Sequence, residues 1–207
     1  MGSSPITRSK MRKIYIDGGA WYGDTIEAFL GVKNYNYPTP SSDYPIKPRS
    51  DAAEYEIYAF EVSDDCLKKL RELKYPNLRI IEEAMWVEDG EVDFRTDESS
   101  MICSVSMFRL LDNNFPIKRK PCLHFSKWFA ETCKPEDYIV LKLDVEGSEI
   151  FLLKDLIDKK LDSWINELYV EYHYPHQGVN GMEEVREYLD NHFRNLPSLV
   201  HYENRWL

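Results

Sequence analysis

The sequence predicts an α/β fold in which helices cover a mainly parallel β-sheet. Short apolar runs alternate with amphipathic helical patterns along the chain, which is typical of this fold class. The chain has 207 residues, of which 43% are apolar and 14% aromatic, so it can bury a core and is not expected to be disordered. This length fits one domain, or one domain with a small appendage.

The strands are predicted from short runs of aliphatic and aromatic residues. In chain order they span residues 13–16, 57–60, 78–81, 138–143, 167–171 and 199–202. Residues 85–87 and 91–95 flank a turn at 88–90, and we expect them to pair as a hairpin. Acidic residues stand at the ends of four of these strands: Asp17, Glu61, Asp144 and Glu171.

The helices are predicted where apolar residues recur at helical spacing. They span residues 25–30, 63–73, 123–133, 148–158 and 182–193. We expect Ser63 or Asp64 to cap the second helix and Ser126 to cap the third, because short polar side chains accept hydrogen bonds from the free N–H groups of a helix start.

Two segments depart from this alternation. Residues 1–12 are polar and basic, and we interpret them as a flexible N-terminal segment or the remnant of an expression tag. Residues 34–54 form a Pro/Tyr-rich insertion with prolines at positions 38, 40, 45 and 48. Proline fixes φ and removes an N–H donor, so this insertion is predicted to be a loop, and a loop of this length is usually a lid or a binding loop.

Charge and cysteine content exclude several classes of protein. The net charge of −10 disfavours nucleic-acid binding, which requires clustered Lys and Arg, and docking on an anionic membrane. No apolar run approaches the ~20 residues that span a bilayer. The four cysteines are scattered without a CxxC pair, which argues against a zinc site and a disulfide framework. We therefore expect a cytoplasmic protein with neither a nucleic-acid partner nor membrane insertion.

A glycine-rich turn joins the first strand to the first helix. Asp17, Gly19 and Gly23 have the spacing Asp-x-Gly-x-x-x-Gly, with Ala20 and Trp21 between the glycines. Glycine allows the backbone to approach a ligand without a Cβ clash. The spacing differs from the Gly-x-Gly-x-x-Gly of dinucleotide sites, which disfavours a nicotinamide oxidoreductase. The alternative is a structural turn without a ligand.

The remaining strand ends carry further candidate residues. Glu61 stands where nucleotide-binding α/β folds hold ribose hydroxyls, although it could be a solvated acid. Asp144 follows a buried run, whereas Glu146 and Glu149 are also explained as acids favoured at a helix start.

Glu171 and His173 lie two residues apart, so both side chains point to one face of the strand. Together with Asp144 from the neighbouring strand they could hold a divalent cation or act as a general base. A structural histidine is the alternative.

These motifs together resemble the FkbM-type methyltransferases. The resemblance is carried by residues 15–25, 58–61, 141–149 and 167–171, with Lys-Leu-Asp-Val-Glu-Gly-Ser-Glu at 142–149 its most specific part. It covers residues 13–207 and implies a single methyltransferase domain with a Rossmann-like three-layer sandwich around a mostly parallel sheet. It also implies that S-adenosyl-L-methionine is the cofactor.

The resemblance assigns roles to the candidate residues. In the glycine-rich turn, the residues implied to bind the cofactor are Asp17, Gly19, Ala20, Trp21 and Gly23. Glu61 would bind the ribose, and Ala84 and Met85 would flank the adenine. Asp144 would lie beside the transferred methyl group, with Glu171 and His173 on the acceptor side.

Two arrangements would activate an acceptor hydroxyl. His173 or Asp144 could act as general base. Alternatively, Asp144, Glu171 and His173 could hold a divalent cation, and their O and N ligands favour magnesium or manganese over zinc. We lean towards the cation, because three convergent polar ligands are costly to bury without one.

The function implied is O-methyl transfer to a hydroxyl of a sugar or glycan. The first alternative is methyl transfer to a non-sugar small molecule. The second is a cofactor-binding module without catalysis inside a larger glycan-modifying protein. The sequence departs from the family pattern at Gly18, where an apolar residue is common, and at His124, where an acid is common.

Overall fold

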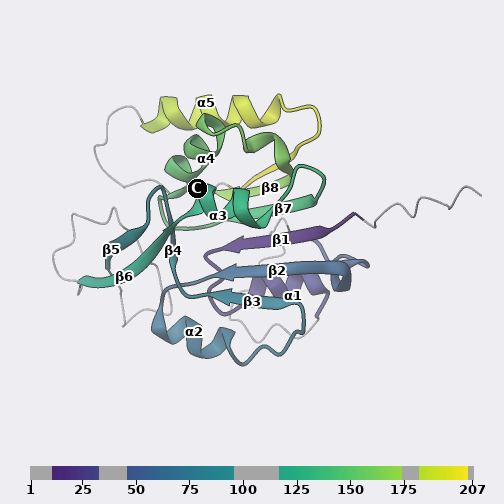
Figure 1. Cartoon of the computed structure of the whole chain (residues 1–207), viewed down its shortest axis with the longest axis vertical. Helices are drawn as coiled ribbons and strands as arrows, with labels where there is room; N and C mark the ends of the chain where they lie inside the picture. Colours follow the sequence, from purple (N-terminus) through teal and green to yellow (C-terminus); the bar gives the residue numbers. More distant parts are fainter. Residues whose placement is uncertain (1–10, 33–45, 96–116, 174–181, 205–207) are drawn as a thin grey trace, which may run out of the picture.

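A six-stranded sheet forms the centre of the molecule (Figure 1). The computed structural model describes residues 11–32, 46–95, 117–173 and 182–204. The sheet has the order β3-β2-β1-β7-β8-β9, and every neighbouring pair in it is parallel. Its strands are β1 (Lys13–Gly18), β2 (Tyr55–Phe60), β3 (Leu78–Ile81), β7 (Tyr138–Leu143), β8 (Ile165–Glu171) and β9 (Val200–Asn204).

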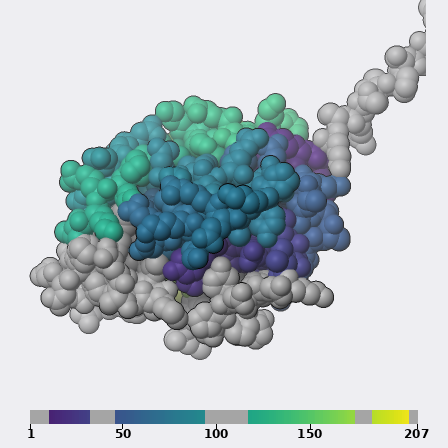
Figure 2. Space-filling view, turned by 90° about the horizontal axis from the view of Figure 1, so that it is seen from below, coloured from purple at the N-terminus to yellow at the C-terminus, as the bar shows by residue number. Residues whose placement is uncertain are grey.

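Helices cover both faces of this sheet, as expected for a three-layer sandwich. Five α-helices lie in the described residues: α1 (Asp24–Leu30), α2 (Asp64–Leu70), α3 (Phe125–Thr132), α4 (Glu149–Asp158) and α5 (Met182–Arg194). Buried residues of α1 and α2 share one core cluster, and those of α3, α4 and α5 share the other. Figure 2 views the molecule from the side of α2.

Alternation along the strands builds these two cores. In β1, Ile14 and Ile16 pack in the cluster with α3 to α5, whereas Tyr15 between them packs with α1 and α2. In β7, Leu141 and Val140 divide between the faces in the same way. This is the period of two that extended backbone imposes, and it confirms the predicted α/β class.

A second, three-stranded sheet lies at the end towards which β1 to β3 point (Figure 1). It consists of β4 (Ala84–Trp86), β5 (Gly90–Arg95) and β6 (Ile117–His124). The predicted hairpin is wrong: β4 and β5 are strands, but β6 lies between them, parallel to β4 and antiparallel to β5. The pairing partner comes from a segment distant in the sequence, which local turn chemistry does not specify.

The boundaries of two helices differ from the expectation. The helix predicted at 123–133 begins only at Phe125, because Leu123 and His124 belong to β6. Ser126 is therefore inside α3, where its hydroxyl donates to Asp155 instead of capping the helix. Ser63 does occupy the N-cap position of α2, without a side-chain capping bond, and α2 ends at Leu70.

The part of the Pro/Tyr-rich insertion that the structure describes packs against the sheet. Ile46 is buried, and a short 3₁₀ helix (Ala52–Glu54) leads into β2. The Arg49 guanidinium bonds the Glu167 carboxylate at 2.5 Å and lies over the ring of Tyr55. Residues 34–45 of the insertion lie outside the described residues, as do residues 1–10. Among the helices described, none is long and apolar enough to span a membrane.

Candidate functional site

The candidate residues meet where the chain order of the sheet changes direction. From β1 the chain proceeds to β2 and β3 on one side, and later strands fill the other side from β7 onwards. Gly18 at the end of β1 pairs in register with Leu143 at the end of β7, and Leu143 pairs with Val170 of β8. Ligands of open α/β sheets bind at this switch point, beyond the carboxyl ends of the strands.

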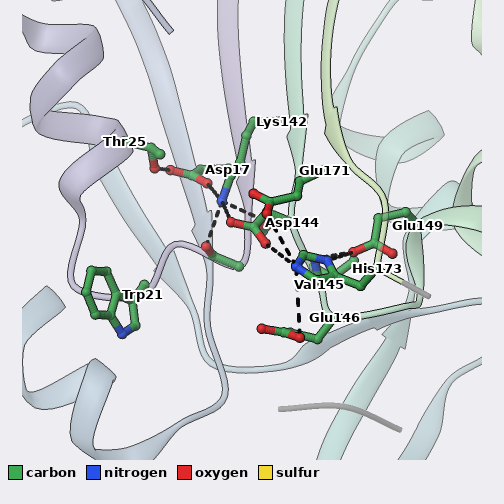
Figure 3. A network of polar contacts seen from close by, with 12 residues as sticks. Asp17, Trp21, Thr25, Lys142, Asp144, Val145, Glu146, Glu149, Glu171 and His173 are labelled. Atoms are coloured by element: carbon green, nitrogen blue, oxygen red, sulfur yellow. Dashed lines mark hydrogen bonds and ion pairs between the residues drawn. The ribbon is translucent and has the colours of Figure 1, made fainter. Parts of the chain in front are cut away.

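Three predicted residues converge there (Figure 3). His173 Nε2 lies 3.8 Å from Asp144 Oδ1 and 3.6 Å from Glu171 Oε1. One ligand atom of each of the three residues lies within 4.8 Å of the others. All three side chains are partly exposed, at 22% for Asp144, 16% for Glu171 and 27% for His173, so a ligand can reach them. The sequence prediction that they lie together is confirmed.

Glu149 holds the other nitrogen of the imidazole ring. Its Oε1 lies 3.2 Å from His173 Nδ1 and accepts a hydrogen bond from the Val145 N–H at 2.7 Å. Its Oε2 accepts from the Gly147 N–H at 2.9 Å, and the residue is fully buried. The imidazole is therefore turned so that Nε2 faces Asp144 and Glu171.

The cluster has an excess of negative charge. Burial and the charge of Asp144 raise the pKa of Glu171 to about 7. Burial by itself lowers the pKa of His173, but the hydrogen bond to Glu149 and the charges of Glu146, Glu149 and Asp144 outweigh it and raise this pKa to about 9. The neighbouring carboxylates thus raise the pKa values of both groups. Two carboxylate oxygens, one imidazole nitrogen and this charge fit a hard divalent cation.

Lys142 joins the cluster to the glycine-rich turn. Its ammonium lies 3.2 Å from Asp144 Oδ2 and 3.2 Å from Asp17 Oδ1. It also donates to the carbonyls of Gly18, at 3.2 Å, and Gly19, at 2.8 Å. The lysine side chain is only 7% exposed. Asp144 thus has one oxygen towards Lys142 and the other towards His173.

The structure places Asp17 behind this surface. It is completely buried, and its Oδ2 accepts hydrogen bonds from the hydroxyls of Thr25 and Tyr15. Gly19 has φ +75°, and a Cβ on it would lie 1.9 Å from the carbonyl oxygen of Asp144. Only glycine therefore lets the turn approach the end of β7 this closely.

Glu61 anchors the same turn from the β2 side. One carboxylate oxygen accepts from the Trp21 N–H at 2.8 Å, and the other from the N–H groups of Val62 and Ser63, both at 2.8 Å. Burial raises the pKa of Glu61, and these backbone bonds act against the rise. The turn is held further by Ala20, whose N–H donates to the Phe60 carbonyl at 2.9 Å.

The residues expected near an adenine lie in β4. Met85 is buried and packs over Gly18, where a Cβ would come within 2.7 Å of the Met85 sulfur. This explains the departure at Gly18: the small residue leaves room for Met85. Ala84 is partly exposed. His124, the other departure from the family pattern, donates its backbone N–H to the Asp89 carboxylate at 2.9 Å.

Sequence reasoning missed Lys142 and treated Glu149 as a helix-start acid. A signal for Lys142 was present in the sequence. A lysine interrupts the otherwise apolar strand Tyr138–Leu143, two residues before Asp144. Glu146, next to the cluster, has φ +55°, which is rare for a residue with a side chain and is typical of functional sites. Its Oε2 lies 4.0 Å from His173 Nε2.

Comparison with protein families gave one match. Residues 31–196, more than half of the chain, match the model of the methyltransferase FkbM domain. The matched region contains Glu61, Asp144, Glu171 and His173 and begins after the glycine-rich turn. The comparisons with curated proteins and with solved structures gave no match.

Proposed function

Because the chain belongs to the FkbM methyltransferase family, we propose that this methyltransferase uses S-adenosyl-L-methionine to methylate a hydroxyl of a sugar or glycan. The observation that carries the proposal is the cluster of Asp144, Glu171 and His173 directly beside the glycine-rich turn. A cofactor site and a site that activates a hydroxyl are thereby adjacent, as methyl transfer between two bound molecules requires.

On the cofactor side, S-adenosyl-L-methionine would supply an electrophilic methyl group on a sulfonium. Gly19, Ala20, Trp21 and Gly23 would line its methionine part, with Asp17 supporting the turn from behind. Glu61 would bind the ribose, and Ala84 and Met85 would lie against the adenine. The excess negative charge around Asp144 supports binding of a cationic sulfonium in this proposal.

On the acceptor side, Asp144, Glu171 and His173 would hold magnesium or manganese, which would lower the pKa of a bound hydroxyl and orient a sugar diol. The fit of these donors to a hard cation supports this arrangement. In the competing arrangement no cation is needed, and His173 or Asp144 takes the proton of the acceptor hydroxyl. Both arrangements draw their catalytic residues from Asp144, Glu171 and His173, but Glu171 has a role only where a cation is bound.

Other parts of the proposal rest on the composition of the chain. Among the described residues, Cys122 and Cys133 are buried thiols outside any disulfide, which supports a cytoplasmic location. We propose that residues 13–207 act as one methyltransferase domain. A non-sugar acceptor and a role as a module of a larger glycan-modifying protein are the alternatives.

Calorimetry tests the cofactor first. S-adenosyl-L-methionine is expected to bind and NAD to give no heat, and absence of S-adenosyl-L-methionine binding would refute the proposal. Methyl transfer is then screened against monosaccharides and glycans by detecting S-adenosyl-L-homocysteine. Asp144→Ala and His173→Ala are expected to abolish turnover of any acceptor found. If both variants retain full turnover, the catalytic residues lie elsewhere.

A chelator separates the two acceptor-side arrangements. Treatment with EDTA, followed by its removal, is expected to abolish turnover, and manganese or magnesium is expected to restore it. Full turnover after chelation would exclude the arrangement with a cation and would favour general-base catalysis by His173 or Asp144.

A further inference from the structure

Glu149 connects three separate parts of the site through one carboxylate. It is the first residue of α4, it is fully buried, and it bonds the backbone N–H groups of Val145 and Gly147 in the preceding loop. Its third partner, His173, lies beyond the end of β8, 24 residues further along the chain. An acid that only favours its own helix would need neither this burial nor a partner on another strand.

The chemistry of these contacts determines how the imidazole is oriented. Both oxygens of Glu149 accept backbone N–H bonds, so the carboxylate acts as an acceptor throughout and His173 Nδ1 must donate to it. In the neutral ring Nε2 then carries the lone pair, and this atom faces Asp144 and Glu171 at 3.8 and 3.6 Å. Histidines that ligate metals commonly donate their other nitrogen to a carboxylate in this way.

We infer that Glu149 is a positioning residue that fixes the tautomer and the orientation of His173 for cation binding, an inference that rests on the proposed cation site. The same carboxylate holds the two N–H groups on either side of Glu146, the residue with φ +55°. Glu149 therefore stabilises the strained loop next to His173 as well as the imidazole itself.

The test measures manganese binding directly, by titration with detection of free Mn²⁺ by electron paramagnetic resonance. Glu149→Gln is expected to weaken Mn²⁺ binding by about 10- to 100-fold, the usual effect of removing such a supporting group. Asp64→Asn is the matched control, because Asp64 is also the first residue of a helix but is exposed and pairs with Lys120. It is expected to leave Mn²⁺ binding unchanged.

A double-mutant cycle shows whether Glu149 acts through His173. In a His173→Ala background, Glu149→Gln is expected to change Mn²⁺ affinity much less than in the wild type. An equal loss in both backgrounds would mean that the effect comes from charge or from the loop, and it would overturn the inference. Unchanged affinity of Glu149→Gln in the wild-type background would overturn it as well.

A measurement on the wild type covers the case in which Glu149→Gln does not fold. In the magnesium-saturated protein, ¹⁵N–¹H correlation spectra are expected to show His173 protonated at Nδ1 and unprotonated at Nε2. Protonation at Nε2 with a bare Nδ1 would overturn the inference. If the wild type binds neither Mn²⁺ nor Mg²⁺, the proposed cation site itself fails, which is a different result from the failure of Glu149 alone.

Discussion

Replacing Lys142 with methionine is expected to destabilise the fold strongly. The side chain keeps its approximate volume, but the ammonium that lies 3.2 Å from the Asp17 carboxylate is lost. Asp17 is completely buried, so its charge would remain without its cationic partner. Removing one partner of a buried ion pair typically costs about 3–5 kcal/mol. For a chain of this length, that corresponds to a fall in Tm of roughly 6–20 °C.

Chemical denaturation and calorimetric melting measure this loss. Lys154→Met is the control, because Lys154 makes an exposed, solvent-screened pair with Asp158, and this variant should leave stability almost unchanged. The double variant Lys142→Met with Asp17→Asn removes both charges and is expected to recover a large part of the loss. A loss below about 1 kcal/mol for Lys142→Met, or no recovery in the double variant, would refute the buried-charge argument.

Two further predictions concern the turn and the helix layer. Gly19→Ala should cost more stability than Gly31→Ala in urea denaturation: both glycines have positive φ, but only at Gly19 would the new Cβ meet a backbone atom, the Asp144 carbonyl oxygen, at 1.9 Å. Equal losses would contradict the close approach. Burial by itself raises the pKa of Asp155, but its bonds, chiefly to Lys159, outweigh this and lower it. Asp155 therefore stabilises the fold above the ordinary carboxyl pKa and loses this effect as pH falls through its lowered value. Asp155→Asn should cost about 1–3 kcal/mol at pH 7, and this difference should vanish in acid; a pH-independent difference would contradict it.

The strands and much of the site follow from local patterns. An apolar run with alternating burial is a property of a few neighbouring residues, so β1, β2, β7 and β8 were predicted to within a few residues. The meeting of Asp144, Glu171 and His173 followed from two rules: parallel strands end at one edge of a sheet, and residues two apart share a face. Neither rule needs the remainder of the fold.

Contacts between distant segments did not follow from such patterns. β6 pairs with both β4 and β5, and no turn signal in the sequence encodes that choice. The observed start of α3 differs from the predicted start for the same reason. Pairing with β4 extends β6 to His124, so the helix begins only after that residue.

The sequence by itself determined an α/β methyltransferase fold and the three residues at its strand ends, because period-two burial and strand-end position are local properties of the chain. Only the tertiary structure decided the contacts of Lys142 and Glu149. Their partners, Asp17 and His173, lie 125 and 24 residues away along the chain. A buried charge is tolerated only where folding brings such partners to it, so its role is defined by the packed molecule.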